Sequence, residues 1–499
     1  MNNLMRRHFI GGKKLVDPTS TVFEVETNSP DQTFEITLFL DGNYNFEVDW
    51  GDGSINTITT YNDANLIHNY SNTGNYDVVL TGTVNGIKIL NQPRIKYIKQ
   101  WGSALNWAGF ENCGLLEDLS TDIPQSFRNN SMASFFLNST SFTGGVNMNN
   151  WNVSGITEFT QCFRDTSFNS NINNWDVSSA SKLDIMFFGT PFNQPLNNWD
   201  VSNCIDFRAM FHSCPDFNQD ITAWTFNSVT NFTLAEMFIS ANSFNQDIST
   251  WDVSNCNNMS YMFQNNTIFN QDISTWNVSS VTTMRSMFQG SVFNIDISSW
   301  NVSGVTNMQD MFRASQYNKP LNTWNVSNVT TMSAMFFQSQ FNQPLNSWVT
   351  SACNNMQSMF RSCPFNQDIS TWNVSSLING FGMFQDNTLF NQDLSNWSTG
   401  VLNDTRNMFR NTSANFNASS WVVQNLSFAD NMFLDSDLST SNYDALLVGW
   451  ESQKPNLEQG VLLGLGTTQY TAGSEAETAR ANLTDPAQFN WTITDGGAI

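Results

Sequence analysis

Carboxylates are the chemical groups that this sequence repeats most regularly. Six aspartates occupy equivalent places, each four residues before a tryptophan: Asp220, Asp247, Asp272, Asp296, Asp368 and Asp393. If the segments that carry them stack, like charges line up, which predicts a solvated acidic edge. Oxygen ligands also suit hard cations, so Asp220, Asp247, Asp272 and Asp296 are candidates for Ca²⁺ bound between repeats. Proline replaces the aspartate at positions 195, 320 and 344, which weakens the calcium hypothesis.

The remaining chemistry favours a protein without a catalytic centre. Glycoside hydrolysis needs two carboxylates placed together in a cleft, and a row of equivalent aspartates offers no such pair. No Ser/His/Asp set, phosphate-binding loop or zinc-ligand spacing is present, and the chain has only three histidines. We therefore expect no catalytic residue and no cofactor apart from the calcium hypothesis. A polysaccharide-degrading enzyme stays as an alternative of a different class.

The seven cysteines follow the repeat and not a metal-binding pattern. Cys204, Cys256 and Cys353 each lie five residues after a repeat tryptophan, where other repeats place valine. Small buried apolar residues are the simplest interpretation, and a disulfide or a metal site is the alternative. The sequence predicts that Cys204 and Cys256 stay reduced and unpaired.

The charge balance excludes two classes of partner. The chain of 499 residues has 20 Lys and Arg against 43 Asp and Glu, a net charge of −23. Nucleic-acid binding needs a basic stripe, so we expect no nucleic-acid partner, and an anionic membrane surface is disfavoured for the same reason. No 18-residue apolar run predicts a membrane span. The basic N-terminus lacks the apolar stretch of a secretory signal peptide.

A tryptophan repeat of 24 to 27 residues organises most of the chain. It comprises Trp151, Trp175, Trp199, Trp224, Trp251, Trp276, Trp300, Trp324, Trp348, Trp372, Trp397 and Trp421. A phenylalanine follows by 12 residues in all but one repeat, and an aromatic-Asn pair precedes the next tryptophan. One such unit cannot bury its own aromatic side chains, whereas stacked units can. The tryptophans and phenylalanines are thus predicted core residues, and the asparagines an internal hydrogen-bonded ladder.

Two periodicities within each unit predict its secondary structure. Residues 273–278 form a short Ser/Thr-rich run of strand type. In residues 281–288 the apolar side chains recur at helical spacing, which predicts a short α- or 3₁₀-helix. One strand and one helical turn for each unit is the plan of a leucine-rich repeat. The fold class that follows is α+β, mostly β, with a leucine-rich-repeat-like solenoid of about 12 turns.

The two ends of the chain differ from the repeats. Residues 34–40, 46–50, 68–70 and 74–80 read as strands of a small β-sandwich, with a tight turn at Gly51-Asp52-Gly53. Residues 443–450 have the pattern of an amphipathic helix. We predict an attachment segment at 1–19, a sandwich at 20–90, the solenoid at 91–435 and a C-terminal cap at 436–499.

Residues 20–90 resemble a PKD domain. The resemblance rests on Val48-Asp-Trp-Gly-Asp-Gly-Ser54, His68-Asn-Tyr70 and Gly74-Asn-Tyr-Asp-Val78. It implies an immunoglobulin-like sandwich that serves as a spacer or adhesive module.

Residues 96–435 resemble the BspA-like repeats of bacterial surface proteins, relatives of leucine-rich repeats. The units read F-N-Q-D-I-S-x-W-D/N-V-S-N-V-T-x-M-x-x-M-F, after an entry at Gln100-Trp-Gly102. Residues 438–450 and 491–497 are similar to the end cap of such proteins. The resemblance implies adhesion or protein–protein contact and carries over no catalytic residue.

Together these observations predict a non-enzymatic structural or adhesion protein whose solenoid contacts a host or surface protein or a glycan. Surface-acting relatives normally carry an export signal or an anchor, and neither is found in this sequence. A virion surface component, of the kind found in phages, is therefore preferred over an exported bacterial cell-surface adhesin in the extracellular space. Arg6, Arg7, Lys13 and Lys14 would attach the acidic body to a scaffold, capsid or tail protein.

Overall fold

The structure is a computed structural model that describes residues 9–10, 13–14, 17–103, 105–118, 120–226 and 229–499. The chain divides into two compact units, residues 1–229 and 230–499. Both are mostly β or irregular, with few helices. Most of the predicted attachment segment, including Arg6 and Arg7, lies outside the described residues. Within it, β1 (Phe9–Ile10) and β2 (Lys13–Lys14) pair antiparallel.

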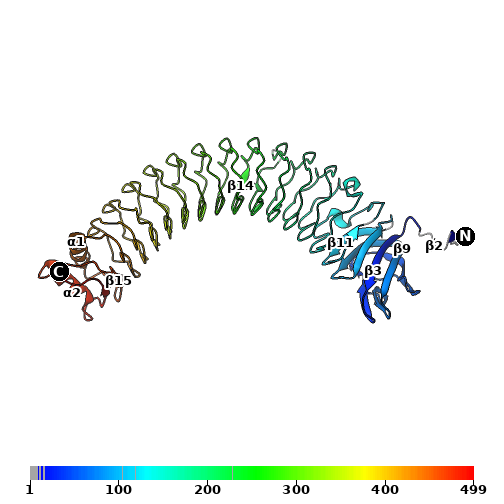
Figure 1. The fold of residues 1–499 in the computed structure, drawn as a ribbon, viewed down its shortest axis with the longest axis horizontal. Coiled ribbons are helices and arrows are strands. Elements are labelled where there is room, and N and C mark those ends of the chain that lie inside the picture. The colour runs from blue at the N-terminus through cyan, green and yellow to red at the C-terminus, as the bar shows by residue number, and fades with distance from the viewer. Residues whose placement is uncertain (1–8, 11–12, 15–16, 104, 119, 227–228) are drawn as a thin grey trace. The chain divides into compact units, whose positions relative to one another are not determined.

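A mixed sheet forms the first half of unit 1 (Figure 1). Its strand order is β12-β10-β3-β9-β6-β7, and β5 and β11 also pair with β9. The strands are β3 (Thr21–Thr27), β5 (Thr37–Leu38), β6 (Tyr44–Asp49), β7 (Ile55–Ile58), β9 (Gly74–Leu90), β10 (Ile95–Gln100), β11 (Leu105–Glu111) and β12 (Glu117–Asp118). A separate pair is formed by β4 (Gln32–Glu35) and β8 (Ile67–Tyr70), which follows the short 3₁₀-helix η1 (Ala64–Leu66). The strands predicted at 46–50, 68–70 and 74–80 are confirmed, and the one predicted at 34–40 is divided between β4 and β5 in different sheets. The larger sheet continues past residue 90.

The second half of unit 1 consists of stacked irregular coils. Two short 3₁₀-helices, η2 (Arg128–Asn130) and η3 (Met148–Asn150), are the regular elements described there. Single parallel bridges join successive coils at Ser131, Glu158, Lys182 and Asp206.

Unit 2 begins with the parallel pair β13 (Phe232–Thr233) and β14 (Cys256–Asn258) and continues as a β-solenoid of about eight turns (Figure 1). One parallel bridge per turn runs through Asn258, Thr283, Asn307, Thr331, Asn355, Asn379, Asp404 and Phe428. The repeat tryptophans of unit 2 are at most 3% exposed, and the repeat phenylalanines are buried. The prediction that these aromatic residues form the core is confirmed.

The predicted helix at residues 281–288 is wrong. The segment is a pair of hydrogen-bonded turns, because Ser286 has a φ of 53°. A left-handed residue prevents the backbone N–H groups from reaching four residues back, and they point out of the coil instead. Those of Met284, Ser286, Phe288 and Gly290 donate to carbonyls of the next coil, at 2.8–3.0 Å. Each coil is thereby attached to its neighbour through the backbone.

The predicted strand at residues 273–278 is also wrong. The backbone N–H of Trp276 donates to the carbonyl of Ile273 at 3.1 Å, which closes a turn. The Trp276 indole N–H donates to the carbonyl of Ile248 in the preceding coil, also at 3.1 Å. The segment before each tryptophan therefore turns the chain, and the β-bridge lies several residues later, at Thr283.

A C-terminal cap covers the last coil of unit 2. It contains α1 (Thr440–Glu451), which confirms the predicted helix, and α2 (Glu475–Thr484). The parallel strands β15 (Leu462–Gly464) and β16 (Thr492–Thr494) complete it. Arg480 and the hydroxyl of Tyr443 both donate to the buried carboxylate of Asp495. This ion pair joins the cap's two helices to its sheet.

Candidate functional site

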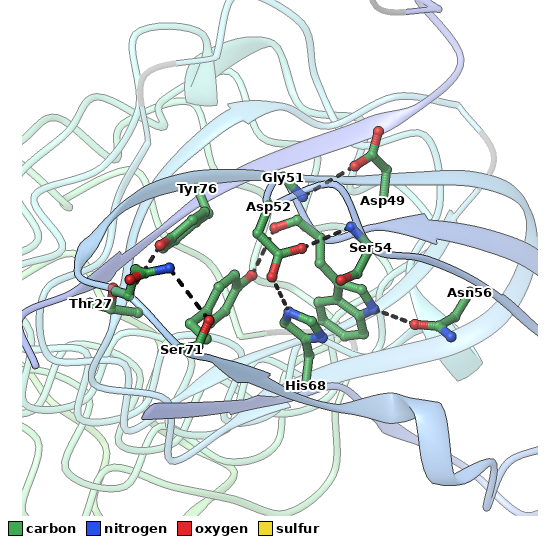
Figure 2. A network of polar contacts seen from close by, with 12 residues as sticks. Thr27, Asp49, Gly51, Asp52, Ser54, Asn56, His68, Ser71 and Tyr76 are labelled. Carbon is green, nitrogen blue, oxygen red and sulfur yellow. Dashed lines mark hydrogen bonds and ion pairs between the residues drawn. The ribbon is translucent and has the colours of Figure 1, made fainter. Parts of the chain in front are cut away.

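The Trp50-Gly-Asp-Gly turn organises a polar network on unit 1 (Figure 2). The His68 ring stacks on buried Trp50 at 4.8 Å, and its Nε2 lies 2.9 Å from Oδ2 of Asp52. Oδ1 of Asp52 accepts from the backbone N–H of Ser54 at 2.9 Å. The Tyr70 hydroxyl donates to the carbonyl of Trp50 at 3.0 Å. These contacts hold the turn against β8.

Asp52 is committed to this network. Partial burial alone would raise the pKa of its carboxyl, but the hydrogen bonds from Ser54 and His68 lower it overall, since they favour the charged form. With both carboxylate oxygens engaged, Asp52 stabilises a tight turn. The network is therefore a structural feature of unit 1.

The aspartates singled out by the sequence lie at exposed turns. In unit 2 each accepts, at 2.9 Å, a hydrogen bond from the backbone N–H two residues later: Asp247 from Ser249, Asp272 from Ser274, Asp296 from Ser298, Asp368 from Ser370 and Asp393 from Ser395. We call these five residues the aspartate edge. Asp220 in unit 1 makes the same bond to Thr222. The carboxylates therefore cap local turns.

The geometry of the aspartate edge does not form a metal centre. Within the described residues there is no group of three or more His, Cys, Asp or Glu side chains that could hold a metal ion. One carboxylate oxygen of each aspartate of the edge already accepts a hydrogen bond from its own turn. Calcium binding between turns, proposed for Asp220, Asp247, Asp272 and Asp296, therefore lacks a converging ligand set in this part of the chain.

Acid should weaken these turns. Hydrogen bonds from the hydroxyl and backbone of the residue two positions later lower the pKa of Asp247, Asp272 and Asp296. A carboxyl whose pKa is lower in the folded state stabilises the fold above its unfolded value of about 4, and this contribution disappears as the pH falls through the folded value. Between pH 5 and pH 2.5, we expect the Tm of the D247N/D272N/D296N variant to fall by less than the Tm of the unmodified protein. Equal slopes in thermal melts across this range would contradict the assignment.

Asp118 and Asp184 are buried carboxylates whose contacts serve the fold. Burial raises the pKa of Asp118, which accepts hydrogen bonds from Ser120 and from the indole of Trp101. Burial also raises the pKa of Asp184, which accepts from the hydroxyl of Thr160 at 2.6 Å. A second carboxylate near each one, Asp122 for Asp118 and Asp206 for Asp184, raises the pKa further.

The asparagines after the repeat aromatics form the predicted ladder, but at the surface. In unit 2 the Oδ1 of Asn245, Asn270, Asn294, Asn318, Asn342 and Asn366 accepts from the backbone N–H of the next equivalent residue, at 2.9–3.1 Å. These side chains are exposed or half-buried, so the expectation of an internal ladder is wrong. The coil already satisfies its inner backbone groups through its neighbours.

All seven cysteines are buried and unpaired in the structure, in agreement with their predicted packing role. Burial raises the thiol pKa to about 12 for Cys113, Cys204, Cys214 and Cys256, and to about 11 for Cys353 and Cys363. Because thiolates are the reactive form, we expect almost no labelling by a thiol reagent at pH 8 in the native protein. All seven should react after denaturation without reductant. Fewer than seven would indicate a disulfide, including one between Cys204 and Cys256.

Sequence inspection missed an ordered face on the solenoid of unit 2. It consists of two columns, one residue per coil. The first column follows the repeat phenylalanine: Gln264, Gln289, Arg313, Phe337, Arg361, Gln385 and Arg410. The second lies three residues before that phenylalanine: Ser260, Arg285, Gln309, Ser333, Gln357, Phe381 and Arg406. We call these fourteen positions the arginine face.

Side chains on the arginine face stack on one another between coils. The guanidinium groups of Arg313 and Arg361 lie over the Phe337 ring, at 5.0 and 5.5 Å from its centroid. Arg406 lies 5.3 Å from the Phe381 ring and 5.0 Å from that of exposed Phe428. The signal available in the sequence was the 24-residue spacing of Arg313, Phe337 and Arg361. The signal was missed because the residue type at this position varies from coil to coil, whereas the neighbouring positions are nearly constant.

The fold and its one-residue-per-coil columns define a β-solenoid repeat protein. The chain belongs to the family described as "Mycoplasma protein of unknown function, DUF285", which matches residues 130–235, 229–314, 289–364 and 337–446, together well over half of the chain. No curated protein and no solved structure matches it. None of the helices described is long and apolar enough to span a membrane.

Proposed function

We propose that this chain is a non-enzymatic structural or adhesion protein whose solenoid presents an ordered surface to a protein or glycan. The observation that carries the proposal is the set of polar and aromatic side chains, most of them half-exposed, that recur in fixed register along unit 2. Backbone hydrogen bonds between coils fix their spacing, so little conformational entropy remains to be lost on binding. Extended surfaces of this kind are what solenoids use to bind partners.

The finer assignments are part of the same proposal. A PKD-like, immunoglobulin-like sandwich at residues 20–90 is supported by the β4–β8 pair beside the larger sheet and by the network around Trp50. A BspA-like solenoid of about 12 turns is supported by the tryptophan spacing in both units. The domain limits at 19/20, 90/91 and 435/436 remain predictions.

The site of action is proposed to be a virion surface, with the bacterial cell surface as the alternative. The description of the matching family names Mycoplasma, a cellular organism, and this favours the alternative. Mass spectrometry of purified particles and immunogold labelling of intact cells separate the two locations. Finding the protein only in the soluble interior of cells would overturn both. Hydrolysis of a polysaccharide by the purified chain would instead support the enzyme alternative.

The attachment role of the N-terminus needs its own experiment. Deleting residues 2–14 should leave the melting temperature of the isolated protein unchanged and abolish its incorporation into the particle or envelope. Lowered melting with normal incorporation would show that the segment belongs to the sheet of unit 1.

A further inference from the structure

Charge is sorted between two surfaces of unit 2. Residues 230–499 contain eight Lys and Arg against 20 Asp and Glu, so the unit is strongly acidic. The arginine face nevertheless holds five of these cations, Arg285, Arg313, Arg361, Arg406 and Arg410, and no carboxylate at any of its fourteen positions. The aspartate edge lies at other positions of the coil. The arginine face is therefore the part of unit 2 that suits an anionic group.

Most hydrogen-bond donors of these arginines are still available. Arg313 has a loose ion pair with Asp310 at 3.5 Å, and Arg361 with Asp386 at 3.8 Å. Their side chains are 40% and 33% exposed. Among the described residues Arg410 has no ion-pair partner, whereas Arg406 is neutralised by two bonds to Asp404. A guanidinium has five N–H donors, so one long contact leaves room for a carboxylate.

The stack with Phe337 orients these donors. A guanidinium that lies over a ring keeps its N–H groups in its own plane, so they point out around the edge of the stack. The edge of the phenyl ring is itself the positive end of its quadrupole. Packing against the Phe337 ring also reduces the side-chain entropy that the two arginines lose on binding.

The spacing of three of these cations indicates the kind of partner. Arg313, Arg361 and Arg410 occupy every second coil, separated by Phe337 and Gln385. At about 4.8 Å per coil, the anions that match them must be roughly 10 Å apart. A peptide in β-strand conformation presents same-face side chains about 6.8 Å apart, which does not fit. An acidic polyproline-II peptide, with one face about every 9.3 Å, is separated from a glycan by the poly-glutamate measurement below. A linear glycan with a carboxylate on every second sugar does fit, because two hexose rings in a row cover about this distance.

We propose that the arginine face binds a linear acidic glycan of alternating type, with one uronic acid in each disaccharide, along the solenoid. Arg313, Arg361 and Arg410 bind the carboxylates. The like charge of the aspartate edge is screened over about 8–10 Å at physiological salt. This inference rests on the proposed function and specifies its surface and its ligand.

Unit 1 carries a related triplet in the same repeat position. Arg164 lies over the Phe188 ring at 5.1 Å from its centroid, and the His212 ring is 4.5 Å from Phe188. Burial lowers the pKa of His212, so this triplet has one permanent cation at neutral pH. We therefore assign the principal binding to unit 2.

The test is binding of the full chain to hyaluronan oligosaccharides of defined length, measured by biolayer interferometry. We expect binding that R313Q/R361Q weakens at least tenfold. The matched control, K319Q/K454Q, removes two cations outside the arginine face and should leave affinity unchanged. R313K/R361K keeps the charge but loses the planar fork, so it should restore only part of the affinity. Melting curves confirm that each variant is folded.

Three outcomes would overturn the inference. They are absence of hyaluronan binding, equal binding of neutral dextran, and tighter binding of poly-glutamate with the same arginine dependence, which would indicate an acidic protein partner. Surface location, and attachment of the protein to its particle or cell, are measured separately. The proposed function can therefore survive failure of this test, and the glycan assay can succeed even if the protein has another location.

Discussion

Trp300→Ala should destabilise unit 2 by about 3–5 kcal/mol, the usual cost of removing a large buried aromatic side chain. The indole is 3% exposed and stacks on Trp276 with ring centroids 6.4 Å apart and planes 5° apart. Its N–H donates to the carbonyl of Ile273 at 3.1 Å, so alanine would also remove one of the two hydrogen bonds that this carbonyl accepts. The cavity would lie between coils, and each coil depends on its neighbours.

Chemical denaturation monitored by circular dichroism measures this effect. Leu389→Ala is a suitable control, because the leucine side chain is 56% exposed and its loss should cost no more than about 0.5 kcal/mol. In a repeat array such a mutation can divide a single unfolding transition into two, so calorimetry should accompany the denaturation curves. If Trp300→Ala and Leu389→Ala cost the same, the tryptophan stack does not stabilise the solenoid.

The sequence was sufficient to predict which residues are buried. Trp300, Phe288 and Met284 recur with a period that only stacked coils can satisfy, so their burial follows from the repeat. The same reasoning failed for the backbone. Apolar residues at helical spacing predicted a helix at residues 281–288, yet Ser286 and Gly290 are left-handed.

The left-handed positions are only partly recognisable from residue types. At the position of Ser286 the other coils have Asp310, Ala334 and Ser358, all with φ between 53° and 56°. Gly382, Asn407 and Asn431 occupy the same position in three later coils, also at φ of 55–56°, and these residue types do favour a left-handed backbone. The alanine, serine and aspartate of the other coils obscured that signal. Tertiary hydrogen bonds hold them there, since each of these N–H groups donates to the next coil.

The candidate binding surface could not be predicted from the sequence either. The regular aspartates drew attention because they repeat, and the structure uses them for turns. The arginines of the arginine face do not repeat in every unit, so a search for a consensus discards them. Their proximity becomes visible only once the coils are placed in register, with Arg313 and Arg361 on either side of Phe337.

Removal of residues 438–499 should abolish cooperative folding of unit 2 and lead to aggregation. The cap binds the last coil through its backbone. The indole of Trp450 donates to the carbonyl of Ala418 at 2.9 Å, and Gln453 both donates to the carbonyl of Trp421 and accepts from the N–H of Val423. The N–H of Phe433 donates to the carbonyl of Gly464 at 3.0 Å. Without these partners the coil would expose an apolar face and an unpaired backbone edge.

An internal deletion is the sharpest control for that truncation. Removing residues 349–372 takes out one complete 24-residue repeat, joins Trp348 to Asn373 and retains the cap. Because Trp-Asn-Val is restored at the junction, the register of every remaining coil is kept, and this variant should be monomeric with a single cooperative melt. Removing only residues 349–360 would place unlike positions of neighbouring coils opposite each other. This variant should therefore aggregate like the capless chain. Light scattering and calorimetry of the three variants test whether only the 24-residue deletion stays monomeric and melts cooperatively. A soluble, cooperatively melting capless chain would show that the solenoid needs no cap.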